Sequence, residues 1–443
     1  MRGVFTDVRV LAVDTVRVCW RLFPQILTIY LLGWLGTNLA LKIAVIVGDV
    51  SGWVALAIFA FSFLSTLVAV VLILRLCGRQ LGIWNMMPPE ESIVDDRDSS
   101  LTRMLAVTSP PFLSLYAAFG QVNEAAGRLL TEQLFRNSVF GPDSVLDVVR
   151  SVATDHPWRL LLILLVVYSV RRVLDVVHER THIRVFGLAV ALLESFFILV
   201  FIFGGFVLVN RAKSWLGDRV FNAWIDGVQR GVSSLLSLIH LRLPALLARA
   251  FGYLTDEIWP VLWPVISQPI IWLAVASLVF GSQVLSLAEL WRKGEPIASR
   301  VPGASTFARR ADKLAWRRIG PPPSGVARVA VEVKEAFLGD VDDKYLPTFH
   351  SIRLVLRAGA VFLGSYVLLY TALIVIQNAV LRFLRFLVGG RPVEFWVIYD
   401  PLIDLLQMLP WELLRICLMA AAFRRCLEVF QLRGERVERV VAS

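Results

Sequence analysis

The chain has 443 residues, of which 57% are hydrophobic and only 18% charged, and its mean hydropathy is +0.68. A single water-soluble core cannot bury this share of apolar residues, so the composition excludes an ordinary soluble globular protein and predicts apolar side chains that face lipid. The formal net charge of +10 would favour nucleic acid as partner of a soluble protein, but here the basic residues cluster beside apolar runs. In a membrane protein this pattern sets topology and attracts anionic headgroups, so we expect a lipid bilayer as partner and no nucleic acid.

The apolar runs predict an all-α, polytopic integral membrane protein with about eight transmembrane helices and additional amphipathic helices at the interface. In chain order, we expect a cytoplasmic amphipathic helix (1–22), spans 1–3 (23–120), an outer loop (121–157), spans 4–5 with a basic connector (158–210), outer interfacial helices (211–258), span 6 (259–290), a basic cytoplasmic loop (291–350), spans 7–8 (351–423) and a basic cytoplasmic tail (424–443).

The first segment, 1–22, carries apolar residues at helical spacing against arginines, which indicates a helix lying on the inner membrane surface. Spans at 23–47 and 53–76 follow it. Placing the strongly basic connectors inside puts both termini in the cytoplasm of a multi-pass plasma-membrane protein. Arginine greatly outnumbers lysine, and we interpret the chain as a bacterial protein of the cell inner membrane.

Prolines interrupt two of the predicted spans. Pro110 and Pro111 lie within the short third span, and Pro264 and Pro269 lie at the start of the sixth. Because proline lacks an N–H and clashes with the preceding turn, these positions predict helix breaks. Discontinuous helices line the binding sites of some transporters, so the breaks are candidate parts of a transport path.

The segment 232–251 is apolar enough to be considered as a further span, as a re-entrant segment or as an interfacial helix. A further span would place the basic loop 291–350 outside, against the positive-inside rule. We therefore expect this segment in the outer interface.

One pattern of catalytic type occurs in the basic connector between spans 4 and 5. His178 and His182 are spaced one helical turn apart with Glu179 beside them, which would let the imidazoles hold a metal while the carboxylate activates a bound water. This pattern resembles the motif of zincin metalloproteases, although Arg180 inside it is charged where that family usually is not. The resemblance implies zinc as cofactor, with His178 and His182 as ligands and Glu179 as catalytic base.

A catalytic zinc site needs a third protein ligand, and the nearest candidate is Glu194, which a straight helix would carry about 18 Å away. The other interpretation of the connector is a solvated inner turn with two incidental histidines. The four cysteines contain no Cys-x-x-Cys pair, so neither a thiolate zinc site nor a disulfide framework is expected.

Charged residues inside spans form the second candidate site, because burial in lipid is costly unless such groups are paired. Glu194 lies in the fifth span, where Arg415 or Arg357 is its candidate partner. The remaining residues belong to the eighth span: Asp400, Asp404, Glu412 and Arg415. They would form either a transport path or a set of structural contacts, in which Asp400 caps the helix, Asp404 lies beside Arg382 and Arg385, and Glu412 pairs with Arg415.

Three functions follow from these features. We expect first a non-enzymatic envelope component that scaffolds, assembles or translocates, with protein partners or as a homo-oligomer. The second is a secondary transporter or channel subunit that uses the charged residues of the eighth span. The third, and the only enzyme among them, is a zinc-dependent membrane metalloprotease.

Overall fold

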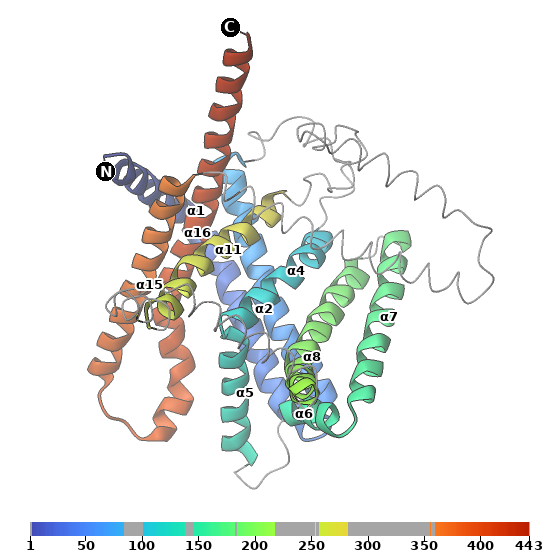
Figure 1. The fold of residues 1–443 in the computed structure, drawn as a ribbon. Coiled ribbons are helices and arrows are strands. Elements are labelled where there is room, and N and C mark those ends of the chain that lie inside the picture. The colour runs from blue at the N-terminus through green and yellow to red at the C-terminus, as the bar shows by residue number, and fades with distance from the viewer. Residues whose placement is uncertain are drawn as a thin grey trace, which may run out of the picture.

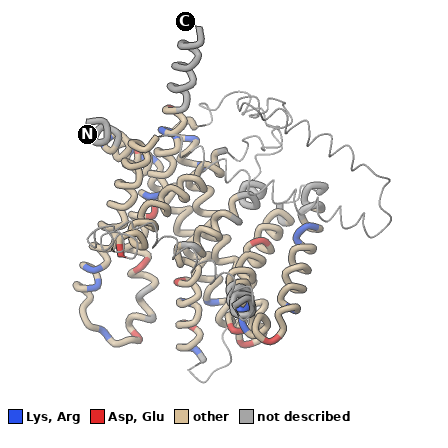
Figure 2. Tube along the Cα trace, in the orientation of Figure 1, with Lys and Arg blue, Asp and Glu red and all other residues tan. Residues whose placement is uncertain are grey.

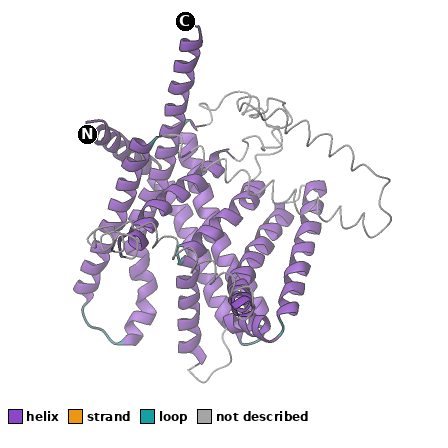
Figure 3. Cartoon of the chain, in the orientation of Figure 1, coloured by secondary structure: helices purple, strands orange, loops and turns teal. Residues whose placement is uncertain are grey.

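The computed structural model describes residues 2–83, 101–137, 145–181, 184–217, 253, 257–281, 355 and 359–442. Every regular element in these ranges is a helix, as Figures 1 and 3 show, so the all-α class is confirmed. The helices are α1 (Arg2–Gly48), α2 (Gly52–Leu81), α4 (Leu101–Ala118), α5 (Gln121–Asn137), α6 (Val145–Asp155), α7 (Pro157–Thr181), α8 (Arg184–Gly217), α11 (Trp259–Gly281), α15 (Ala360–Val388) and α16 (Val393–Ala442). The predicted interfacial segment 232–251 and basic loop 291–350 lie outside the described residues.

Within the described ranges, six helices are long and apolar enough to cross a membrane, fewer than the eight or so expected from the sequence. They are Val8–Gly48, Gly52–Leu81, Phe186–Gly205, Trp259–Phe280, Ala360–Val388 and Pro401–Val429. The third and fourth predicted spans form α4 and α7 but are not among the six. α4 has only 18 residues, with two prolines and several hydroxyl groups, and the second half of α7 is rich in charge.

The two ends of the chain lie at the same end of the bundle. Figure 1 shows the start of α1 and the end of α16 on the same side, with α16 projecting beyond its neighbours. This arrangement suits an even number of crossings. The assignment of that side to the cytoplasm stays a prediction.

α1 is one continuous helix from Arg2 to Gly48, with Pro24 inside it. The sequence divided this stretch into a surface helix and a first span, but no helix end separates them. Trp20 is 81% exposed on this helix, while Leu22 and Ile26 are buried against the bundle. The predicted surface helix, 1–22, is therefore the N-terminal part of α1, the same helix that packs in the bundle.

The prolines predicted to break spans lie within helices. α4 continues across Pro110 and Pro111, and α11 continues across Pro264 and Pro269. The chain breaks instead after α4, where Gly120 takes a φ of 76° and α5 begins one residue later. Glycine adopts this left-handed conformation without the strain that a Cβ would cause, so the turn follows the glycine rather than the prolines. The hydroxyl of Tyr366 on α15 donates a 3.1 Å hydrogen bond to the Pro269 carbonyl.

The tightest described packing joins α1 to α2. A Cβ added at Gly33 would lie 2.5 Å from the Cβ of Ala69, so the two backbones approach closely only because Gly33 has no side chain. Thr37 and Thr66 share a 3.0 Å hydroxyl contact across the same interface. Small residues and hydroxyl groups are the usual means of holding helices together in lipid, where hydrophobic attraction between helices is weak.

We therefore expect Gly33→Ala to destabilise the protein by about 1–3 kcal/mol, because the Ala69 Cβ is fixed to its backbone and α1 must move away. Gly364→Ala in α15 is the matched control, since a Cβ there meets nothing within 4 Å. Unfolding in mixed detergent micelles measures both. Equal stability of the two variants would contradict the close α1–α2 contact.

Candidate functional site

Charged residues are sparse in the middle of the bundle and gather near helix ends, as Figure 2 shows. The predicted site residues Glu194, Asp404, Glu412 and Arg415 all have ion-pair partners. Asp400 lies within α16, and its side chain is outside the described set. α16 begins at Val393 and runs through Pro401 and Pro410, so Asp400 is not an N-terminal cap of a helix that starts at Pro401.

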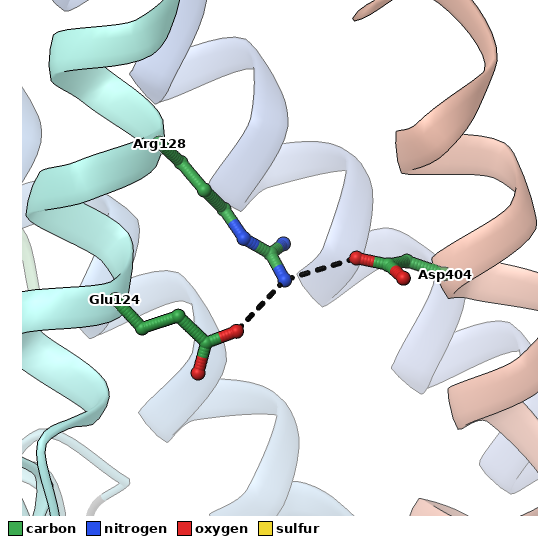
Figure 4. Close-up of polar contacts among 3 residues, drawn as sticks. All are labelled: Glu124, Arg128 and Asp404. Carbon is green, nitrogen blue, oxygen red and sulfur yellow. Dashed lines mark hydrogen bonds and ion pairs between the residues drawn. The ribbon is translucent and has the colours of Figure 1, made fainter. Parts of the chain in front are cut away.

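Asp404 pairs with Arg128, which lies on α5. The Arg128 Nη2 atom lies 3.0 Å from an Asp404 carboxylate oxygen and 3.1 Å from Glu124, one turn away on α5 (Figure 4). The Asp404 side chain is 12% exposed, whereas the Arg128 side chain is 45% exposed. The sequence offered Arg382 and Arg385 as neighbours of Asp404, and the structure shows Arg128 of α5 as an ion-pair partner that the sequence did not suggest. This contact attaches α5, predicted as part of an outer loop, to α16.

Glu194 pairs with Arg171. Their closest atoms are 3.6 Å apart, and each side chain is only 5% exposed. Arg171 also lies over the ring of Tyr168 at 5.6 Å. The expected partners were Arg415 or Arg357. Arg357 lies outside the described residues. The structure pairs Glu194 with Arg171 because α7 packs along α8, where Glu194 lies within one turn of the centre of the apolar segment Phe186–Gly205.

Glu412 and Arg415 form a charged pair at the middle of the apolar segment of α16. They are 2.7 Å apart, and Arg415 is the central residue of the apolar segment Pro401–Val429. The Arg415 Nη2 atom also donates a 2.6 Å hydrogen bond to the side-chain oxygen of Gln377 on α15. Tyr370, on α15, shares a side-chain hydrogen bond with the same guanidinium. The expected Glu412–Arg415 pair is therefore present, and two neutral groups of α15 extend it.

Residues of further helices complete this polar cluster. The hydroxyl groups of Tyr30 on α1 and Tyr116 on α4 lie within electrostatic range of Glu412 and Arg415. Gln407 on α16 donates to the backbone oxygen of Gln377 at 3.4 Å. Gln377 and Tyr30 each lie within one turn of the centre of their apolar segments. Trp411 lies between Gln407 and Arg415 along α16, and its indole nitrogen is buried. We call this set the central polar cluster: Tyr30, Tyr116, Tyr370, Gln377, Gln407, Trp411, Glu412 and Arg415.

The sequence motif that resembles a zincin site lies at the end of α7. His178 and Glu179 are within that helix, while His182 is outside the described residues, so a metal pair there stays a prediction. Glu194, the candidate third ligand, is held by Arg171. Among the residues that the structure describes, no group of three or more His, Cys, Asp or Glu side chains is arranged to hold a metal ion.

Three cysteines that the sequence gave no reason to join lie together, because Cys417 on α16 contacts both Cys19 on α1 and Cys77 on α2. The Cys77 and Cys417 sulfur atoms lie 3.8 Å apart although 340 residues separate them, and both side chains are fully buried. All four cysteines are free thiols in the structure. Cys77 and Cys417 pack between α2 and α16 as small apolar side chains.

Comparisons with protein-family models, curated proteins and solved structures found no match to this chain. The chemistry of the site therefore comes from its own geometry. The central polar cluster joins an acid and a base that neutralise each other, three phenol hydroxyl groups and two amides. Such groups can exchange protons and hydrogen bonds with a small guest, and intramembrane acids of this kind commonly lie on ion or proton paths.

The Arg171–Glu194 pair predicts a double-mutant cycle. Arg171→Met removes the guanidinium from a buried carboxylate and should cost about 3–5 kcal/mol, whereas Arg171→Met combined with Glu194→Leu should lie within about 1 kcal/mol of the natural protein. Detergent unfolding of Arg171→Met, Glu194→Leu and the double variant measures the coupling. Additive losses would show that the two side chains do not interact.

Proposed function

We propose that this multi-pass membrane protein is a channel subunit or secondary transporter that passes protons along the side of α16 that faces α15. The observation that carries the proposal is the central polar cluster, in which the Glu412–Arg415 pair lies at the centre of an apolar segment and contacts α15 through Gln377 and Tyr370. A helix that served only as an anchor would not need these groups at this depth.

The exposure of Glu412 supports the same function. Its side chain is 34% exposed while that of Arg415 is 11% exposed, so the carboxylate is the more accessible member of the pair. Protonation of Glu412 would weaken its attraction to Arg415, which would then be held by Gln377 and Tyr370. The cluster therefore offers two arrangements of the same hydrogen bonds, one for each protonation state of Glu412.

A scaffold or assembly component is the second candidate. The Arg128–Asp404 contact fastens α5 to α16, and the Arg171–Glu194 contact fastens α7 to α8, which suits a rigid framework. α16 also continues as helix to Ala442, past the end of its apolar segment at Val429, and projects from the bundle (Figure 1). This extension favours a protein partner at that end.

Proton flux into liposomes separates these functions. The purified protein is reconstituted into liposomes that contain a pH-sensitive dye, and the outer pH is then lowered. The lumen of these liposomes should acidify faster than that of liposomes without protein. Glu412→Gln should slow this proton flux by roughly tenfold or more. The variant removes the ionisable carboxyl group but keeps the size of the side chain.

Glu428→Gln is the matched control. Glu428 also pairs with arginines of α16, Arg424 and Arg425, but lies outside the central polar cluster. The Glu428→Gln variant should conduct protons as fast as the natural protein does. A natural protein that conducts no faster than empty liposomes, or a Glu412→Gln variant with unchanged flux, would favour the scaffold.

A further inference from the structure

Three buried polar atoms on one face of α16 make no hydrogen bond within the part of the chain that the structure describes. The side-chain oxygen of Gln407, the indole nitrogen of Trp411 and the Nε atom of Arg415 have no hydrogen-bond partner among the residues that the structure describes. Gln407 is only 2% exposed. Such atoms are rare in folded proteins and costly, because burial removes their water without a replacement.

The three residues recur at intervals of four, so they follow one stripe of the helix over about 12 Å. Gln377 of α15 fixes both ends of this stripe, since its backbone oxygen accepts from Gln407 and its side-chain oxygen accepts from Arg415. Trp411 lies between them along α16. The three atoms therefore belong to one face of α16, at its contact with α15.

The charges at the stripe define what would bind there. Arg415 is neutralised by Glu412, so the site carries no net charge. Trp411 and Arg415 offer N–H donors, and Gln407 offers an amide oxygen as acceptor. The complementary guest is electroneutral, accepts hydrogen bonds at one side and donates one at the other.

We propose that Gln407, Trp411 and Arg415 form a binding stripe for an electroneutral hydrogen-bonding guest, either a short file of water molecules or a small uncharged solute. The inference deepens the proposed function, because such a guest would link Glu412 to the rest of the path. Bound water commonly satisfies buried polar groups of this kind through two to four hydrogen bonds.

Hydroxyl-radical footprinting in lipid nanodiscs tests the water arm directly, with water itself as the probe. Radicals formed from water held against a side chain oxidise it, so Trp411 should be oxidised several-fold faster than Trp272. Trp272, a buried tryptophan of α11 that packs against the rings of Phe112 and Tyr116, is the reference. Because Trp411 is only partly buried, the change in its own oxidation in the next variant decides between bound water and simple exposure. Gln407→Leu should lower the oxidation of Trp411 toward that of Trp272, because it removes the acceptor end of the stripe.

A high-resolution electron cryomicroscopy map of the same full-length protein distinguishes the two guests. Separate rounded peaks within hydrogen-bond distance of the three atoms identify water, and one connected feature that bridges two of them identifies a solute. Either supports the stripe. Oxidation of Trp411 no faster than that of Trp272, together with an empty map at the stripe, overturns it. Rapid Trp411 oxidation in a protein that passes no protons would contradict the proposed function and leave the stripe intact.

Discussion

A polar side chain inside a bilayer has no bulk water to pair with, and this constraint organises the described part of the protein. The buried charges there form ion pairs with a residue of another helix or of the next turn of the same helix. Glu194 pairs with Arg171, Asp404 with Arg128, and Glu412 with Arg415. These contacts do more than neutralise charge, because the first joins the consecutive helices α7 and α8 and the second joins segments 276 residues apart. The position of the helices is thus coupled to the pairing of the charges.

The central polar cluster differs from the other two contacts. Arg171–Glu194 and Arg128–Asp404 each join an acid and a base on two helices, whereas Arg415 pairs with Glu412 of its own helix and contacts the neutral residues Gln377 and Tyr370 on α15. The cluster also contains three buried polar atoms, on Gln407, Trp411 and Arg415, that have no hydrogen-bond partner among the described residues. The cluster therefore gathers more polar groups than its single charge pair requires, and this makes it the candidate working site.

The sequence was sufficient to predict most of what depends on local composition. Long apolar runs predicted the all-α membrane class, and the i, i+3 spacing of Glu412 and Arg415 predicted their pairing. The partners of Glu194 and Asp404 depend on which helices pack together, and a single sequence does not show that directly. Arg128 was missed for a further reason, because its segment is polar and suggested an outer loop. Gln377, Gln407 and the tyrosines were missed because uncharged polar residues in a span give no signal until a charge is placed beside them.

The central claim is that one face of α16 is polar and reachable from water within the bilayer. Reaction of engineered cysteines with a charged thiol reagent that does not cross lipid tests it most directly, in a chain whose four natural cysteines are replaced by serine or alanine. The account predicts that a cysteine at Gln407 reacts, while a cysteine at Leu406, which is 65% exposed on another face of the helix, does not. An unreactive cysteine at Gln407, or equal reaction at both positions, would contradict it.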